Sequence, residues 1–568
     1  MFRVASHGLH DVTAYGGVSS SSHPWATAAG VQMLLRGGNA MDAALATAFA
    51  LTVVEPAMSH LGGQGNMLVH MAKEGKTVAL DFYPTAPAAA HESMYEWIPT
   101  PTQGGYRFWT KDDLNTTGAL SVCVPGNVAA WLYAHRRWGS LPLEVIVEPA
   151  ITYARQGAPM TRRMAAFSAE ARDRLARFPA TARLFLRSDG SPLQEGDVVI
   201  QEDLARTLTL IAREGEEVFY RGEIARAIVS FLQEQGGIIT MQDLERYPRE
   251  DFRVVAPERV PYRGYEVEAT PANSSVVLLP IMRLLNEFDL SRYEPLAGEK
   301  LHILAECMKL AFADRLSHTG DPGFFQIPVD GLLSPGYTAA RRALVRMDAA
   351  GYPAAGDPWP YQSEAPRERK TNSRQLGGDD NAHTTHHSHV DRHGNFISFT
   401  QSLGDAFGSA LVVPGYGIIL NNAMKLFDPR PGFNNSVGPR KRPATAPCPA
   451  MLLRDGRPVM ALGSPSGTRI INAVAQTIVN VVDHQMSLQA AVNLPRIHWS
   501  GDEFELEKDI PEESKAILRA LGHDLQERNA KSPWFGAIQA VARDPETGLC
   551  HGAADPRRQG AAAGCTLL

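Results

Sequence analysis

The pattern of apolar and polar positions changes once along the chain, from a helical period to a strand period. Before residue 352, apolar positions recur at helical spacing in windows such as "GNVAAWLYAHRRWG" and "EKLHILAECMKLAFADRL", which is typical of amphipathic helices. After residue 383, apolar and polar positions alternate in short runs bounded by turn residues, which is typical of strands. The sequence therefore predicts a helix-rich first part, and a second part in which strands pack against helices.

Two helices are expected near the N-terminus, in "HPWATAAGVQMLLRGGNAMDAALATAFALTVVEP". Gly37, Gly38 and Asn39 separate them. Asn39 is a suitable N-cap for the second helix because its side-chain oxygen can accept hydrogen bonds from the first free N–H groups. The small alanines of that second helix indicate close packing against other elements.

Three hairpins are expected in the second part of the chain. "HHSHVDRHGNFISFTQSL" turns at residues 392–394, and "PAMLLRDGRPVMAL" turns at Asp455-Gly456, the strongest short-range hairpin signal present. "FGAIQAVARDPETGLCHGAA" gives the third, and a helix is expected from Thr468 to Val482. Strands and helices without regular βαβ alternation favour an α+β or a layered α/β/α architecture.

Residues 352–383 form the clearest linker, rich in Pro, Gly and charge and without apolar periodicity. The linker ends a first region, residues 1–383, and precedes a second region, residues 384–568. At 568 residues the chain is too long for one ordinary core, so it should hold two or more domains or one large fused domain.

Composition is that of a soluble globular protein, with 44% hydrophobic and 20% charged residues. The formal charge of −6 shows no basic excess, which argues against a nucleic-acid partner. The five cysteines are scattered without a CxxC pair, so we expect reduced, buried thiols and no disulfide framework.

The N-terminal stretch "MFRVASHGLHDVTAYGG" lacks a charged region followed by an apolar one, so no signal peptide is expected. The longest apolar run, Ala43 to Val54, is too short to cross a bilayer. We therefore expect a cytoplasmic protein without a membrane partner.

The stretch "GGDDNAHTTHHSHVD" at the end of the linker admits three interpretations. A metal site would use the histidines, but HExxH and CxxC companions are missing. A solvated linker entering an edge strand is the simplest interpretation on residue chemistry alone. The third is a self-cleaving precursor, in which Thr384 becomes a new N-terminus with its hydroxyl as nucleophile and its α-amine as base.

Several long motifs resemble the gamma-glutamyltransferase family of N-terminal-nucleophile hydrolases, in the right order and over nearly the whole chain. They include "MDAALATAFALTVVEPAMSHLGGQGNMLVH", "VPGNVAAW", "TTHHSHVDRHGNFISFTQSLGDAFGSALVVPGYGIILNNAM", "RKRPATAPCPAML", "GSPSGTRIINAV" and "HGAADPRRQGAA". The resemblance implies an α+β fold, a four-layer αββα sandwich with a helix-rich large-subunit region. It also favours self-cleavage over the other two interpretations of the threonine pair.

The resemblance implies cleavage between His383 and Thr384, which yields a large fragment, 1–383, and a small fragment, 384–568. It assigns Thr384 as the catalytic nucleophile and base, and Ser402 as a hydroxyl that supports it. The backbone N–H groups of Ser466 and Gly467 match the positions that stabilise the oxyanion. The fragments would remain together as a heterodimer, and a dimer of heterodimers is left open. No cofactor and no metal are implied.

The residues that recognise a gamma-glutamyl head group are missing. The family motif "ALDFRE" reads "ALDFYP" here, so Tyr83 replaces an arginine suited to a carboxylate. The family motif "NNQMDDF" reads "NNAMKLF", so Ala423 and Leu426 replace a glutamine and the acid that pairs with the ammonium. Lys425 adds a cation, unless it is a solvated surface residue.

Gly404 and Asn422 complete the predicted substrate-binding site. The family's small-polar pair after "KRP" becomes Thr445-Ala446 here. A buried ammonium needs an anionic partner, so the substitutions favour an acyl group without an amine. The predicted substrate is a small carboxylic acid amide, such as oxamate, or a glutaryl-type acylase substrate.

Two alternatives remain open beside this amidohydrolase or acyltransferase. The chain is a genuine gamma-glutamyltransferase or glutathione hydrolase if other residues rebuild the head-group site. It is a non-catalytic binding protein if it remains uncleaved, although Thr384, Ser402 and "GSPSG" are all intact.

Overall fold

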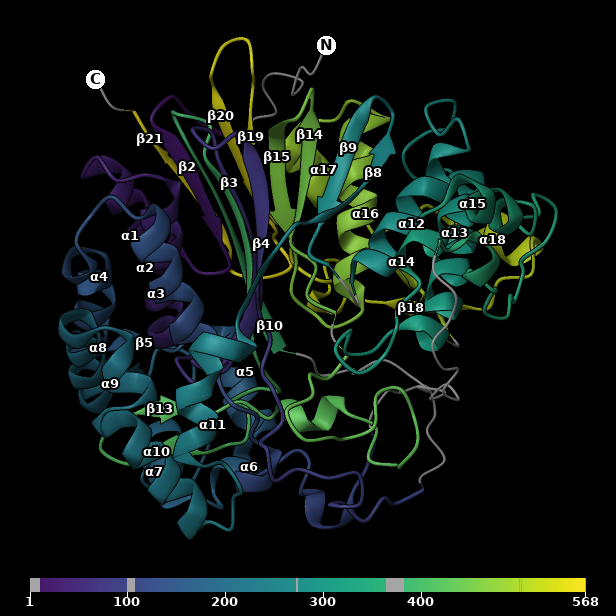
Figure 1. Ribbon diagram of the computed structural model, residues 1–568. Helices are drawn as coiled ribbons and strands as arrows, with labels where there is room; N and C mark the ends of the chain where they lie inside the picture. The colour runs from purple at the N-terminus through teal and green to yellow at the C-terminus, as the bar shows by residue number, and fades with distance from the viewer. Residues whose placement is uncertain are drawn as a thin grey trace.

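Two seven-stranded sheets face each other at the centre of the computed structural model, and helices cover the outer face of each (Figure 1). The layers therefore run helix, sheet, sheet, helix, and the predicted αββα sandwich is confirmed. The structure describes residues 11–99, 108–271, 274–363, 383–444, 446–499, 501 and 503–566.

The first sheet holds the centrally placed hairpin that begins at the threonine pair. Its strands, in spatial order, are β21 (Ala561–Cys565), β2 (Gly17–Ser21), β10 (His383–Asp391), β11 (Phe396–Gly404), β3 (Gln64–Met71), β4 (Lys76–Phe82) and β7 (Arg253–Val255). Every neighbouring pair is antiparallel. The helices on its outer face are α1 (Pro24–Leu35), α2 (Ala40–Val54) and α3 (Asn127–Trp138). With a helix layer on one side and a sheet on the other, β10 and β11 are buried throughout.

The second sheet packs its inner face on the first. Its strands, in spatial order, are β1 (Val12–Ala14), β20 (Cys550–Ala554), β19 (Gln539–Arg543), β15 (Arg457–Gly463), β14 (Ala450–Arg454), β9 (Tyr265–Ala269) and β8 (Glu258–Tyr262). The helices against it are α12 (Ser275–Asn286), α16 (Arg469–Val482) and α17 (Leu488–Asn493).

Two helical lobes extend from the sandwich (Figure 1). The first contains α4 (Leu143–Gln156), α5 (Arg162–Glu170), α6 (Arg172–Leu175), α7 (Pro179–Phe185), α8 (Glu202–Glu214), α9 (Glu216–Tyr220), α10 (Glu223–Glu234) and α11 (Met241–Arg246), with the short strands β5 (Ala158–Pro159), β6 (Val198–Val199), β12 (Val412–Val413) and β13 (Ile418–Ile419). The second contains α13 (Gly298–His318), α14 (Val329–Leu332), α15 (Pro335–Arg342) and α18 (Glu512–Ala520), with β16 (Ile497–Trp499), β17 (Phe504–Glu507) and β18 (Leu525–Arg528).

Local signals in the sequence predicted several of these elements correctly. The three hairpins are β10–β11, β14–β15 and β19–β20. Asp455 and Gly456 both have positive φ, 51° and 73°, as the primed hairpin turns require. Asn39 caps α2 in a reciprocal capping box with Asp42.

The sequence analysis missed the strands of the first region, which supplies β1 to β4 and β7 to β9 to the two sheets. The reason is clearest in β3, "QGNMLVHM", where seven of eight residues are buried. A strand covered on both faces has no apolar–polar alternation, so the pattern gave no strand signal.

Strands from before and after the linker are neighbours in both sheets. In the first sheet, β2 lies between β21 and β10, and β11 pairs with β3. In the second sheet, β1 pairs with β20, and β9 pairs with β14. The regions 1–383 and 384–568 therefore build one shared sandwich.

All five cysteines are buried and free of disulfides, which confirms the expectation of reduced, buried thiols. Burial raises the pKa of Cys448 to about 12, consistent with a packing role. None of the helices in the described part of the chain is long and apolar enough to span a membrane.

Candidate active site

The junction between His383 and Thr384 lies at the start of β10, opposite the end of β11. Thr384 is paired with Ser402, and the register shifts between His383 and Thr384. The Thr384 hydroxyl donates to the Ser402 hydroxyl over 3.3 Å. Ser402 Oγ in turn donates to the His383 carbonyl oxygen over 2.7 Å and accepts from the Gly404 N–H over 3.0 Å. One hydroxyl therefore contacts both the threonine side chain and the carbonyl before it.

An arginine and a glutamate hold the backbone on the other side of the junction. Arg558 Nη1 donates to the Thr384 carbonyl oxygen over 2.5 Å, and Nη2 donates to Ser466 Oγ over 3.4 Å. Glu55 accepts from the Thr385 hydroxyl over 2.8 Å. Burial raises the pKa of Glu55, and the Arg558 guanidinium opposes that rise. Arg558 and Glu55 thereby hold Thr384 and Thr385, near the start of strand β10, in place.

A second arginine, Arg163 of α5 in the first helical lobe, is close enough to act on the charges of both Glu55 and His383. Its Cζ lies 4.6 Å from the ring centre of Phe167, and the Phe167 ring lies 4.4 Å from the ring of His383. Burial lowers the pKa of Arg163 to about 10, while the Glu55 carboxylate opposes that shift. Two arginines therefore act on the Glu55 carboxylate, and Glu170 is a second carboxylate near Arg163.

The loop before α16 presents free backbone donors. Ser466 has φ 97° and Gly467 has φ 56°, and a serine rarely adopts such a backbone conformation without a functional reason. Within the described ranges, neither N–H has a hydrogen-bond acceptor. α16 begins at Arg469, so its dipole also favours negative charge near this loop. Arg558 links the loop to Thr384 through Ser466 Oγ.

Three of the predicted substrate-binding residues lie together beside Ser402. A Cβ on Gly404 would meet Asn422 Oδ1 at 2.2 Å, so glycine is required there. Asn422 accepts from the Asp405 N–H over 2.9 Å and donates to Asp405 Oδ2 over 3.0 Å. Lys425 is only 8% exposed, and its ammonium forms an ion pair with Asp405. The alternative that Lys425 is a solvated surface residue is wrong.

The other predicted positions have separate surroundings. Ala423 and Leu426 pack in an apolar cluster with Ala86 and Cys123. Tyr83 is buried just after β4, where its carbonyl accepts from the Tyr247 hydroxyl over 2.8 Å. Thr445 lies outside the described residues, and Ala446 is half-buried after it.

The histidines that follow the threonine pair are packed between layers. His386 Nδ1 lies 2.7 Å from Thr400 Oγ1, and its ring fills the space where Gly463 of the facing sheet has no Cβ. His387 Nδ1 lies 2.8 Å from His389 Nε2. Burial lowers the pKa of all three histidines, that of His389 to about 3, so each is neutral.

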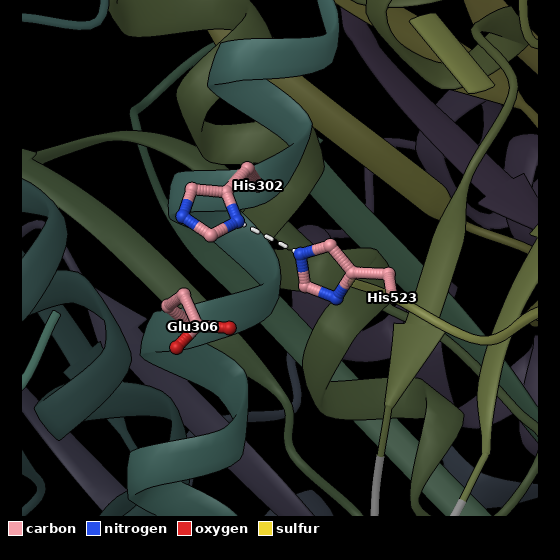
Figure 2. A group of neighbouring side chains, drawn as sticks. All are labelled: His302, Glu306 and His523. Atoms are coloured by element: carbon pink, nitrogen blue, oxygen red, sulfur yellow. Dashed lines mark hydrogen bonds between the residues drawn. The ribbon is translucent and has the colours of Figure 1, made fainter. Parts of the chain in front are cut away.

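One group of three metal-ligating side chains was found among the residues with described positions, at the second helical lobe (Figure 2). His302 Nδ1 lies 2.8 Å from His523 Nε2, and Glu306 lies below them on α13. Lys309 Nζ lies 2.9 Å from Glu306 Oε1 and 3.3 Å from His523 Nδ1. The ammonium neutralises the glutamate and occupies the remaining histidine nitrogen, so this group does not favour a divalent cation.

Sequence reasoning missed Glu55, Arg163 and Arg558 as neighbours of the junction. Glu55 ends the longest apolar run, and Arg558 lies in "HGAADPRRQGAA". A charge inside an otherwise apolar or small-residue motif was the available signal for both. Arg163 carried no such signal, because its helix reads as an ordinary amphipathic surface.

Comparisons with known proteins identify the family. Residues 26–565 match the family model described as Gamma-glutamyltranspeptidase. The chain belongs to the gamma-glutamyltranspeptidase family. It is 37% identical over 561 residues to the glutathione hydrolase proenzyme of Bacillus subtilis (strain 168), covering 97% of this chain and 92% of the relative.

Acylases of the gamma-glutamyltranspeptidase family are equally similar. The chain is 39% identical over 547 residues to the acylase ACY 1 proenzyme of Pseudomonas sp. (strain SE83), covering 96% of this chain and 92% of the relative. The crystal structure of cephalosporin acylase from Bacillus halodurans superposes with a TM-score of 0.85 at 30% identity, covering 100% and 99% of the two chains. The protein is therefore an N-terminal-nucleophile amidohydrolase of this family.

Proposed function

We propose that this chain is a self-processing amidohydrolase of the acylase type. It cuts its own His383–Thr384 bond, giving a large fragment, 1–383, and a small fragment, 384–568. The observation that carries the proposal is the Ser402 hydroxyl, which contacts both the Thr384 hydroxyl and the His383 carbonyl. The relatives named proenzymes support the same conclusion.

Maturation uses the threonine hydroxyl as an internal nucleophile. Thr384 Oγ1 attacks the carbonyl carbon of His383, the C–N bond breaks, and the freed amine takes up the proton. The product is an ester between Thr384 and the His383 acyl group. Water then hydrolyses the ester, leaving a carboxylate on His383 and a free α-amine on Thr384.

Turnover repeats this chemistry on an external amide. The α-amine, with a reference pKa of about 8, removes the hydroxyl proton as Oγ1 attacks the substrate carbonyl. The negative charge on the carbonyl oxygen is stabilised by the free N–H groups of Ser466 and Gly467. The leaving amine takes the proton, and water releases the acyl group from the enzyme.

The residues around the nucleophile favour an acyl group without an ammonium. Lys425 neutralises Asp405, the acid beside Gly404 and Asn422, so this acid does not have to pair with a substrate ammonium. Leu426 stands where the family has the acid that pairs with the ammonium, and it packs against an apolar cluster. A small carboxylic acid amide, oxamate-like or glutaryl, fits these surroundings better than a gamma-glutamyl compound.

A genuine gamma-glutamyltransferase or glutathione hydrolase is the second candidate. The specific observation in its favour is the 37% identity with a glutathione hydrolase proenzyme over nearly the full chain. It would require head-group recognition by residues other than those at Tyr83, Ala423 and Leu426.

Two measurements test the proposal. On a denaturing gel, the purified protein should give two fragments with Thr384 as a new N-terminus, and Thr384→Ala should give one band. Thr384→Ser keeps a hydroxyl and should still cleave. A panel of oxamyl, glutaryl and gamma-glutamyl anilides then sorts the substrate class. An intact unmutated band would refute processing, and turnover of the gamma-glutamyl compound alone would favour the second candidate.

A further inference from the structure

The uncleaved chain carries its own substrate analogue. In maturation, the acyl group attacked by Thr384 is that of His383, and in turnover it belongs to the external amide. The nucleophile is the same in both reactions, so each carbonyl carbon must come to lie against Thr384 Oγ1. The side chain of His383 therefore marks the place of a substrate's acyl chain. This inference rests on the proposed function.

The surroundings of His383 combine an aromatic ring with cations. Its ring packs on Phe167 at a centroid distance of 4.4 Å. The pKa of His383 is lowered to about 3, chiefly by burial; the Asp405 carboxylate opposes this shift, and the cations Arg163, Arg558 and Lys425 add to it. The His383 side chain is therefore a neutral imidazole before cleavage.

Of the three cations near His383, Arg163 is the one without a hydrogen-bond acceptor among the described residues. Arg558 donates to the Thr384 carbonyl, and Lys425 pairs with Asp405. Among the described residues, Arg163 Nε is buried without a hydrogen-bond partner, and the carboxylates of Glu55 and Glu170 act on the guanidinium only as nearby charges. Buried polar groups are nearly always satisfied, so an unsatisfied guanidinium nitrogen beside the nucleophile indicates a ligand that completes it.

We infer that Arg163 is a specificity-determining residue that binds a carboxylate at the far end of the substrate's acyl group. A guanidinium matches a carboxylate in charge and in its paired donors. A dicarboxylic acid monoamide of about glutaryl length fits, because its spacer is comparable in reach to the His383 side chain. Phe167 would then lie against the methylene groups between the two ends.

The test compares two substrates that differ only in the terminal charge. Glutaryl p-nitroanilide carries the carboxylate, and its neutral counterpart carries a terminal carboxamide. We expect the processed enzyme to favour the charged substrate in kcat/KM by about tenfold or more, as a hydrogen-bonded charge implies. Arg163→Met should bring the ratio close to one, mainly through a higher KM. Arg163→Lys should restore part of the preference.

Arg162 provides the matched control. It is the preceding residue of α5 and is exposed, so Arg162→Met removes an equal charge without touching the pocket and should leave the ratio unchanged. Cleavage into two fragments on a gel serves as the measure of correct folding for each variant.

Three outcomes would overturn the inference. One is an unmutated enzyme that does not prefer the charged substrate, and another is an Arg163→Met variant that slows both substrates equally. If Arg163→Met does not fold, free glutarate should still inhibit the unmutated enzyme at least about tenfold more strongly than glutaramate; equal inhibition is the third. Failure of the proposed function would look different, since the unmutated chain would then stay uncleaved and hydrolyse neither anilide.

Discussion

Two buried clusters of charged and titratable side chains can be compared within this molecule. The first is the α13 cluster of His302, Glu306, Lys309 and His523 (Figure 2). Glu306 and Lys309 form an ion pair, and Lys309 also reaches His523, which in turn contacts His302. Each charge in this cluster has an opposite partner, and each ring has a hydrogen-bond neighbour.

The second is the junction cluster of Glu55, Arg163 and Arg558 around Thr384. Here two guanidinium groups act on the Glu55 carboxylate, with Glu170 also near Arg163, and Arg163 Nε has no acceptor among the described residues. The adjacent loop holds Ser466 in an unfavourable backbone conformation. The α13 cluster is thus complete in itself, whereas the junction cluster needs a partner that the folded chain does not supply.

The difference between the two clusters indicates that the α13 cluster serves stability and the junction cluster serves function. A closed network stabilises the fold, and removing one member exposes the others to an uncompensated burial penalty. An open network stores unfavourable contacts that a ligand or a transition state can relieve. The same residue types therefore have opposite roles in the two clusters.

The largest predicted effect distinguishes the clusters by stability. Lys309→Met leaves the buried Glu306 carboxylate without its cation, so the free energy of unfolding should fall by about 3–5 kcal/mol. Arg163→Met removes a cation that forms no hydrogen-bonded ion pair among the described residues and leaves Arg558 beside Glu55, so the loss should stay within about 1 kcal/mol. Urea unfolding of the two variants in the Thr384→Ala background measures both values. Similar losses in the two variants would remove the basis of the comparison.

The next effect concerns the cleavage rate. Ser402→Ala removes the hydroxyl that contacts both the Thr384 hydroxyl and the His383 carbonyl, so cleavage should slow by about a hundredfold. Ser402→Thr keeps a hydroxyl and should cleave nearly normally. The half-time of the uncleaved band on a denaturing gel gives the rate. Unchanged cleavage in Ser402→Ala would deny this residue its supporting role.

A smaller effect is the acid sensitivity that His383 confers on the uncleaved chain. Burial lowers its pKa from 6.5 to about 3, so the folded chain stays unprotonated where the unfolded chain binds a proton. Its contribution is complete above pH 6.5 and is lost as the pH falls towards 3, by about 1.4 kcal/mol per unit. In the Thr384→Ala background, His383→Gln should flatten this dependence between pH 6.5 and 5. Parallel curves for the two proteins would contradict the burial of a neutral imidazole.

The smallest effect is at the strained loop. Ser466→Gly relieves the φ of 97°, so the protein should gain about 0.5–1 kcal/mol in unfolding free energy. The variant keeps the backbone N–H, and acyl transfer should change by less than about threefold. Thermal unfolding and anilide hydrolysis check the two parts. A loss of stability would show that the Ser466 hydroxyl matters more than its backbone strain.

The sequence predicted what short segments encode. The turn at Asp455-Gly456 and the cap at Asn39 follow from local backbone chemistry, and both were found as expected. The pairing of Thr384 with Ser402 follows from the hairpin between them. Family motifs supplied the αββα layers, which composition alone left open.

The rest depends on contacts between distant segments. The first sheet, α2 and α5 bring together Glu55, Arg163 and Arg558. These residues are far apart in the sequence, so no local pattern predicts that they are neighbours. Lys425 is buried because Asp405, on a different loop segment, supplies its counter-ion. Strand β3 was missed because it is covered on both faces.

The alternation of the two regions within each sheet has a consequence for the cleaved protein. β2 is hydrogen-bonded on both sides to strands from beyond the junction, β21 and β10. The two products of a cut at His383–Thr384 thus share both sheets and cannot separate as folded bodies. Their association is governed by an unfolding rate and not by a dissociation constant. Dilution should leave the nicked molecule intact, and denaturation should be hard to reverse, because refolding would require two different chains to meet.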